Sequence, residues 1–190
     1  MPLRHDGDSG TSSLFDGTRS SKTGPRFAAL GDVDELNSVL GFAMTFVTGT
    51  REHQRLAWVQ ERLFRMGSDL ANPKHRARGD RVVDADVEGL DSWLLEYRSA
   101  LPPLQHFVMP GGTPAAAAVH VARSVCRRAE RTAFALAAQH PVGVPVLVFL
   151  NRLSDVLFEM ARYLNAAAKV RDEEWLGPRD RDKKDDVRPD

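Results

Sequence analysis

Residues 113–139 read TPAAAAVHVARSVCRRAERTAFALAAQ, a segment that begins with the residues typical of a helix start. Thr113 is a favoured helix N-cap, and Pro114 is favoured at the first helical position because its fixed φ suits a helix and its missing N–H is not needed there. A run of four alanines follows. His140-Pro141 and Gly143 then interrupt the pattern, since the residue before a proline avoids the helical region. The stretch therefore predicts one long helix.

Four further segments place apolar residues at helical spacing. The segment at about 144–170 is the most apolar of them, and it follows directly after the break. The first of the other three helices is predicted to start at a capping box, Asp32-x-x-Glu35, and to run to Val47. The other two are predicted over residues 56–70 and 87–97. Because no segment alternates as a strand would, the sequence predicts an all-α bundle of five helices.

The two ends of the chain differ from this pattern. Residues 1–31 are rich in Gly, Ser, Thr and Asp and predict a long loop, and loops of this length in compact domains are usually either functional or disordered. Residues 171–190 form a mixed-charge run around Trp175 that predicts a tail that is frayed or disordered at its end. One domain, residues 1–170, is expected.

The composition narrows the class of protein. Basic and acidic residues balance at 26 each, so no overall field favours nucleic acid or an anionic membrane as a partner. The only cysteine, Cys126, excludes an intramolecular disulfide and favours a reducing compartment. Because the chain has neither a membrane-spanning apolar run nor a signal sequence at its start, we expect a cytoplasmic protein.

Four charged residues of the 113–139 helix share one face, with Arg128 beside them. They are Arg123, Arg127, Glu130 and Arg131, at positions i, i+4, i+7 and i+8. Guanidinium groups bind phosphate oxygens in two-point fashion, so the face suits a phosphate ligand. The same pattern is equally typical of a solvent-exposed helix face on which Glu130 pairs with a neighbouring arginine. The alanine-rich packing of the helix indicates that some of these arginines are desolvated and paired.

Other polar residues leave several interpretations open. Asn151 and Asp155 interrupt the most apolar helix and need partners if they are buried, either as ties between helices or as ligand-orienting groups. Cys126 and His120 are interpreted as packed helix residues. No spacing of histidine, cysteine or carboxylates predicts a metal centre.

The segment Gly7-Asp-Ser-Gly-Thr-Ser-Ser13 supplies glycines and hydroxyls that can cradle phosphates, with Lys22 downstream as a cationic partner. It does not match the strand-bounded phosphate loop of nucleoside triphosphatases.

Taken together, these segments resemble the PduO-type ATP:cob(I)alamin adenosyltransferases from about residue 4 to residue 165. Four blocks carry the resemblance: Gly-Asp-x-Gly-x-Ser at 7–12, Gly-x-Val-Asp-Glu-Leu-Asn-Ser at 31–38, Pro-Gly-Gly at 110–112 with His-x-Ala-Arg-x-Val-Cys-Arg-Arg-Ala-Glu-Arg at 120–131, and Leu-Asn-Arg-Leu-Ser-Asp at 150–155.

The resemblance implies a homotrimer whose active sites lie between two subunits, with ATP under the ordered N-terminal loop. One subunit would bind ATP through Gly7, Asp8, Gly10, Ser12, Ser13 and Lys22. The site would be completed by Arg127, Arg128, Glu130, Arg131 and Asn151. Asp34 resembles the acid that pairs with Arg123 across the interface, and Phe107 the aromatic residue that displaces the lower axial ligand of cobalamin.

The mechanism implied by the resemblance is a nucleophilic substitution that needs no protein nucleophile. A reductase supplies an electron to four-coordinate Co(II), Co(I) attacks the 5′ carbon of ATP, and triphosphate leaves. Mg²⁺ and the arginines would stabilise the leaving group.

Two positions depart from the family pattern. Arg4-His5-Asp6 stands where the family has Thr-Lys/Arg-Thr, so Asp6 is expected to weaken ATP binding by charge repulsion. Gly31-Asp32 replaces Gly-Thr, with Asp32 as an equally good helix cap. The alternatives are a non-enzymatic corrinoid carrier with weakened ATP use and a purely structural trimeric bundle.

Overall fold

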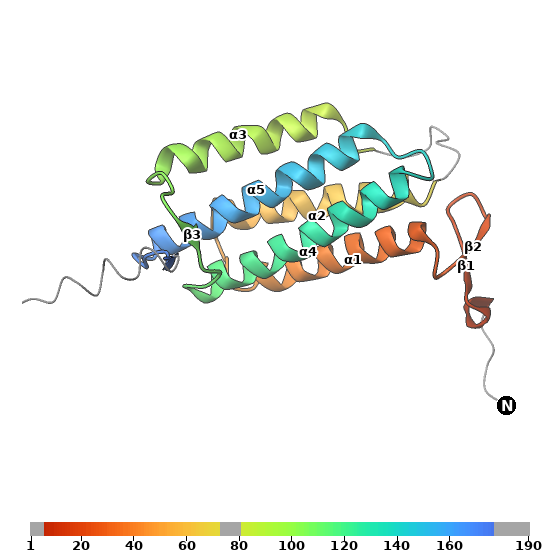
Figure 1. Ribbon diagram of the computed structural model, residues 1–190, viewed down its shortest axis with the longest axis horizontal. Coiled ribbons are helices and arrows are strands. Elements are labelled where there is room, and N and C mark those ends of the chain that lie inside the picture. The colour runs from red at the N-terminus through yellow and green to blue at the C-terminus, as the bar shows by residue number, and fades with distance from the viewer. Residues whose placement is uncertain (1–5, 73–80, 177–190) are drawn as a thin grey trace, which may run out of the picture.

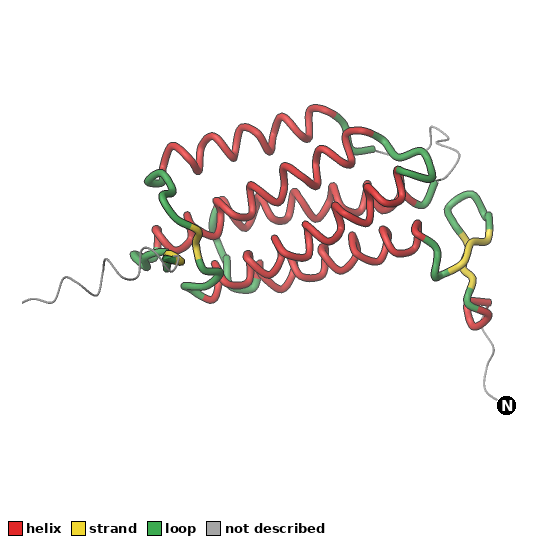
Figure 2. Tube along the Cα trace, in the orientation of Figure 1, coloured by secondary structure: helices red, strands yellow, loops and turns green. Residues whose placement is uncertain are grey.

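Five long helices dominate the computed structural model, which describes residues 6–72 and 81–176 (Figures 1 and 2). The predicted bundle is confirmed in its helix number. The helices are α1 Pro25–Met44, α2 Arg51–Leu70, α3 Asp84–Ala100, α4 Pro114–Ala137 and α5 Val144–Ala167. The final part of the predicted tail, residues 177–190, lies outside the described residues.

Helix α4 occupies the centre of the bundle and packs against both α1 and α5, while α1 also packs against α2 and α3 against α5. The buried face of α4 carries small side chains, among them Ala122, Ala129 and Ala133. Small side chains at a contact allow two helix axes to approach closely. As predicted, Thr113 caps α4, and its side chain accepts a hydrogen bond from Ala116 N at 3.1 Å.

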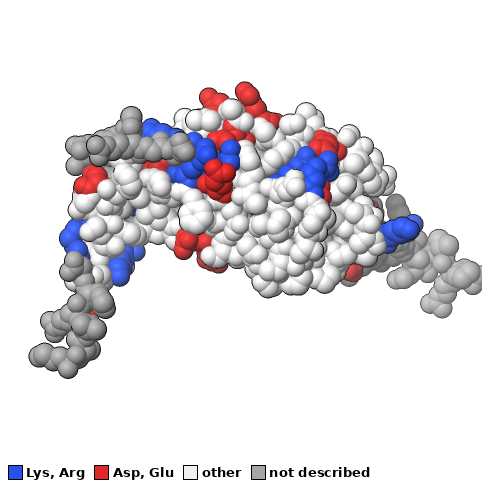
Figure 3. All heavy atoms as spheres, turned by 180° about the vertical axis from the view of Figure 1, so that it is seen from behind, with Lys and Arg blue, Asp and Glu red and all other residues white. Residues whose placement is uncertain are grey.

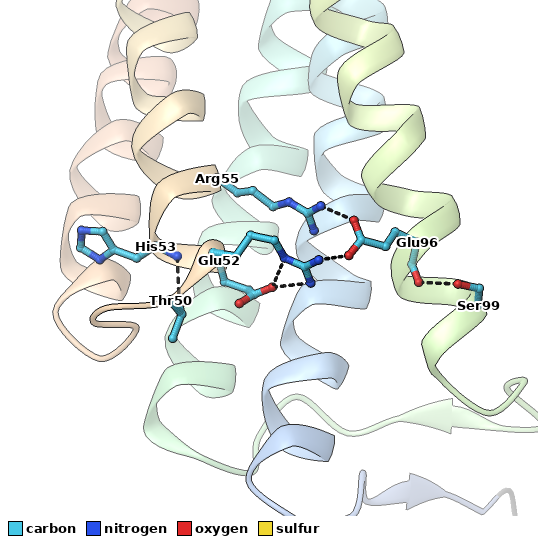
Figure 4. Close-up of polar contacts among 7 residues, drawn as sticks. Thr50, Glu52, His53, Arg55, Glu96 and Ser99 are labelled. Carbon is cyan, nitrogen blue, oxygen red and sulfur yellow. Dashed lines mark hydrogen bonds and ion pairs between the residues drawn. The ribbon is translucent and has the colours of Figure 1, made fainter.

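Charged and aromatic side chains join α2 to α3. Glu96 accepts hydrogen bonds from the guanidinium groups of Arg51 and the buried Arg55 (Figure 4). These bonds lower the pKa of Glu96, with the bond from Arg55 as the largest cause. Because a buried guanidinium is costly unless it is paired, the network fixes the separation of α2 and α3.

The predicted start of the first helix is wrong. Helix α1 begins at Pro25 with Gly24 as its N-cap, so residues 25–31 are helical where a loop was predicted. Asp32 and Glu35 therefore stand within the helix and do not cap it. The proline supplies the same first-turn geometry as in α4, within a segment whose Gly, Ser and Thr content concealed it.

Short strands were also missed. A 3-10 helix, η1 (Asp6–Ser9), precedes an antiparallel hairpin of β1 (Thr11–Ser13) and β2 (Arg19–Ser21). At the other end of the chain, β3 (Phe107–Val108) pairs with β4 (Glu174–Trp175), so the first part of the predicted tail contains a strand. Strands of two or three residues are too short to produce a readable alternation.

These two strand pairs mark opposite ends of the bundle. The β1–β2 hairpin lies beyond the start of α1, whereas β3 lies near the start of α4 and the end of α5 (Figure 1). Within the described residues, no helix is sufficiently long and apolar to cross a membrane.

Candidate active site

The N-terminal hairpin brings Lys22 back to the glycines of the 7–13 segment. Lys22 N donates to Gly10 O at 2.9 Å, and Gly10 has φ +77°, a left-handed conformation that glycine adopts without strain. A Cβ on Gly7 would lie only 3.0 Å from Lys22 Nζ. An exposed ammonium group thus lies against a small-residue turn, as an anion-binding loop requires.

The hydroxyl groups of the hairpin do not all point toward one place. Ser12 and Ser13 are neighbours on β1, opposite Ser20 and Arg19, and successive side chains of a strand point to opposite faces. The structure therefore does not bring both hydroxyls to one face. Asp8 lies in η1 and is exposed.

The arginine face of α4 divides into exposed and paired members. Arg127 and Arg131 are exposed, and Arg131 Nη1 donates to Arg127 O at 3.0 Å. Arg128 instead reaches α1, where its Nε donates to Asp32 Oδ1 at 3.1 Å and its Nη2 donates to Glu35. The bond to Glu35 is the main cause that raises the pKa of Arg128. Arg127 and Arg131 are therefore the members available to a phosphate ligand.

Glu130 and Asn151 form a second tie between helices. Asn151 Nδ2 donates to Glu130 Oε1 at 2.9 Å, which links α5 to the arginine face. Asn151 is exposed and Asp155 is half-buried, so neither is a buried polar group, and the bond from Asn151 to Glu130 is the tie to α4 that was one of the two interpretations. Asp155 lies 3.9 Å from Arg152.

Arg123 is the desolvated arginine of the face. Its guanidinium lies 5.8 Å from the ring centroid of Phe158, and its Nε is buried without a hydrogen-bond partner among the described residues. Burial, followed by the charge of Arg127, lowers its pKa. Asp34 is exposed on α1, at a groove of about 370 Å³ between α1 and α2. The structure does not bring Asp34 and Arg123 together within one chain.

Phe107 is the most exposed large hydrophobic side chain among the described residues, at 79%. Its ring faces that of Trp175 at a centroid distance of 6.4 Å and an interplanar angle of 63°. Such exposure excludes a core-packing role within the chain.

The structure confirms the interpretation of Cys126. It is fully buried, its Sγ donates to Leu150 O at 3.3 Å, and burial raises the pKa of the thiol. His120 is packed too, at 2% exposure, but neither of its ring nitrogens has a partner among the described residues.

Sequence reasoning missed Asn165, a buried asparagine that contacts both the turn before α4 and the segment after α5. Asn165 stands near the end of the most apolar helix. An amide side chain in such an apolar stretch is the sequence feature that could have indicated a buried, hydrogen-bonded residue.

Figure 3 shows basic and acidic side chains adjoining one another on the face opposite to that of Figure 1. On this face the charges of the described residues are mixed, as the balanced composition indicates.

The chain is similar to known proteins over most of its length. The family model of cobalamin adenosyltransferases matches residues 3–164. A cobalamin adenosyltransferase of Cupriavidus metallidurans is 42% identical over 92% of this chain and 93% of its own, and the human corrinoid adenosyltransferase MMAB is 41% identical over 90% and 70%. Among solved structures, a variant PduO-type ATP:corrinoid adenosyltransferase from Lactobacillus reuteri complexed with cobalamin and ATP is 34% identical, with a TM-score of 0.85 over 92% of this chain and 96% of that one. The chain belongs to the cobalamin adenosyltransferase family.

Proposed function

We propose that this protein transfers the 5′-deoxyadenosyl group of ATP to the cobalt of cob(I)alamin, forming adenosylcobalamin and triphosphate. Family membership supports the reaction class, and the related structure complexed with cobalamin and ATP supports the two substrates. The observation in this chain that carries the proposal is the packing of the Lys22 ammonium against Gly7, which suits a triphosphate.

The active site is shared between two subunits of a homotrimer. Within one chain, the hairpin with Lys22 and the strand with Phe107 lie at opposite ends of the bundle (Figure 1). Among residues 6–72 and 81–176, the buried Nε of Arg123 has no hydrogen-bond partner, while Asp34 is exposed at a groove. A second copy would resolve both features, since an isolated buried charge is costly and a carboxylate from a neighbour would compensate it.

The chemistry is a displacement at carbon. The electron pair of Co(I) forms the cobalt–carbon bond to C5′, the C5′–O bond breaks, and its electrons leave with the triphosphate. The negative charge that develops on the leaving oxygen is stabilised by cations fixed in advance. Lys22 of one subunit and Arg127 and Arg131 of its neighbour supply these cations.

The remaining predicted ATP ligands act by shape and position. Gly7 and Gly10 let the backbone approach the phosphates, with Asp8, Ser12 and Ser13 in the same loop, which closes over ATP. Arg128 is held by Asp32 and Glu35, and Glu130 is held by Asn151. These ion pairs and hydrogen bonds fix the arginine face against α1 and α5.

Phe107 prepares the cobalt for reduction. An exposed phenyl ring on a strand can occupy the lower face of the corrin and displace the axial nitrogen ligand. Without that ligand the acceptor orbital of Co(II) falls in energy, so one electron from a reductase produces Co(I). The reducing cytoplasm is the compartment that suits this step.

Mg²⁺ fits the site as an ion carried by ATP. No group of three His, Cys, Asp or Glu that could hold a metal is found within residues 6–72 and 81–176, and Mg²⁺ commonly uses substrate phosphates with one or two carboxylates. Asp8 would contribute the carboxylate. When bound, the ion neutralises phosphate charge.

An anaerobic assay tests the proposal. Purified protein is mixed with ATP and chemically reduced cob(I)alamin, and adenosylcobalamin is followed by absorbance. We expect turnover, with Arg127→Ala severely impaired at unchanged helicity. Cobalamin binding without turnover would instead indicate a corrinoid carrier, and binding of neither ligand a structural bundle.

A further inference from the structure

A buried amide connects three separate segments at the end of the bundle where Phe107 lies. Asn165 Oδ1 accepts from Thr113 N at 2.9 Å and from Thr113 Oγ1 at 3.3 Å. Its Nδ2 donates to Gly111 O and to Asp172 Oδ1, both at 3.1 Å. With 2% exposure and its donors and acceptor all used, this amide has one fixed orientation.

The turn before α4 is shaped around this amide. Gly112 has φ +99°, and a Cβ there would stand 2.2 Å from Asn165 Oδ1. The Gly111-Gly112 turn therefore lies directly on the asparagine, which no larger residue would permit.

Asp172 carries the network from α5 into the C-terminal segment. Its Oδ2 accepts from Arg162 Nε at 3.0 Å. Arg162 is 5% exposed and also donates to Glu159 Oε2 at 2.8 Å and to Pro102 O at 2.9 Å. Asp172 thus joins Arg162 and Asn165, and through them the two ends of the loop that contains Phe107.

The strand that carries Phe107 has little other support. The β3–β4 ladder is two residues long, with Phe107 opposite Trp175, and is extended by the bond from Met109 N to Glu173 O at 2.7 Å. A two-stranded pair is marginal by itself. On the other side of the strand, Val108 lines an open cavity of about 930 Å³, so burial in the core does not hold β3.

We propose that Asp172 is a positioning residue, which anchors β4 to Arg162 and Asn165 and so fixes the place of Phe107 against the corrin. The inference rests on the proposed function of Phe107. Both carboxylate oxygens of Asp172 accept hydrogen bonds from within the chain, so its role does not require contact with a substrate. Asp172 acts because it directly precedes the segment 173–175, which contains β4 and pairs with β3. Its carboxylate ties that segment to Arg162 and Asn165 of α5.

The test compares Asp172→Ala with Asp86→Ala. Asp86 is a matched control because it too accepts one hydrogen bond from an arginine Nε, that of Arg62 at 3.1 Å, and a second from another N–H group, here the backbone N–H of Val83. It differs in lying at the start of α3. Full-length proteins are assayed with ATP, starting either from preformed cob(I)alamin or from cob(II)alamin with a one-electron reductant. Electron paramagnetic resonance of bound cob(II)alamin reports whether the lower nitrogen ligand is still coordinated.

For Asp172→Ala we expect the Co(II)-started rate to fall about tenfold and the Co(I)-started rate by less than about twofold, since a displacement of about 1 Å in a positioning group is costly. The nitrogen-coordinated fraction of Co(II) should rise. Asp86→Ala should change neither readout. If Asp172→Ala does not fold, Asp172→Asn retains an acceptor for Asn165 without the charge, and it should show the same selective loss to a smaller extent.

Equal losses from both starting states, or an unchanged resonance spectrum, in an active protein would overturn this inference alone. A wild-type protein that forms no adenosylcobalamin from cob(I)alamin would overturn the proposed function, and this inference with it.

Discussion

Lys22 and Gly7 are in contact across the N-terminal hairpin, because a Cβ added to Gly7 would stand 3.0 Å from the Lys22 Nζ. A side chain at residue 7 would require the Lys22 ammonium to shift by a few tenths of an ångström. The contact places the ammonium beside the Gly7 backbone and close to the left-handed turn at Gly10.

Gly7→Ala should therefore displace Lys22 and weaken ATP binding without loss of fold. One weakened charge-assisted contact costs on the order of 1 kcal/mol, which is about fivefold in Kd. Isothermal titration with ATP measures the effect. Gly89→Ala is the control, because a Cβ there would meet only Trp58 at 3.9 Å. Equal ATP affinity in both variants would show that the Lys22 contact has no role in binding.

Asp34 and Arg123 should form an ion pair between subunits. Removing one partner of a buried pair costs on the order of 3–5 kcal/mol, so Asp34→Ala should weaken the trimer. The double exchange Asp34→Arg with Arg123→Asp should restore part of the assembly, measured by sedimentation. If the double variant assembles no better than the single variants, the two residues are not partners.

Phe107→Ala should leave the melting temperature nearly unchanged, because the side chain is exposed. The variant should lose far more of the Co(II)-started reaction than of the Co(I)-started reaction, since ligand displacement precedes electron transfer. The control is Leu95→Ala, which removes an exposed apolar side chain elsewhere, on α3. This variant should be active whether the reaction starts from Co(II) or from Co(I). A uniform loss for Phe107→Ala would contradict the displacement role.

Asp6→Thr should improve ATP binding. Asp6 begins η1, in the N-terminal segment that we propose binds ATP, and one unit charge a few ångströms away is worth on the order of 1 kcal/mol in water. The Michaelis constant for ATP should fall several-fold. A constant that is unchanged or higher in Asp6→Thr would defeat the repulsion argument.

His120 should make the protein sensitive to mild acid. Burial, followed by the charge of Arg123, lowers the pKa of His120 below its ordinary value of 6.5. As the pH falls through 6.5, the unfolded chain takes up this proton before the folded chain does, so stability is lost. His120→Gln should flatten the loss of denaturation free energy between pH 7.5 and pH 5. His140→Gln is the control, because it also removes one histidine but at an exposed position. If both substitutions change the pH dependence equally, burial of His120 is not its cause.

Local patterns predicted the helices well because each signal lies within a few residues. Thr113 and Pro114 define the start of α4, and Asn72 follows the end of α2 closely. The start of α1 was missed because Asp32 and Glu35 resemble a capping box, whereas they are the partners of Arg128, 96 and 93 residues away in sequence.

The candidate site was predictable in its residue types and less so in its arrangement. The exposure of Phe107 and the anchoring by Asn165 depend on contacts between the loop before α4 and the segment after α5. Local periodicity carries no information about such contacts.

Mixing two inactive variants tests the proposal that each active site is built from two chains. Lys22→Ala chains and Arg127→Ala chains are co-expressed with different affinity tags, purified through both tags, and assayed with ATP and cob(I)alamin. In a cyclic mixed trimer one site in three joins an intact hairpin to an intact arginine face, so the predicted rate is about one third of wild type. Mixed trimers as inactive as the two parent variants would contradict a site built from two chains.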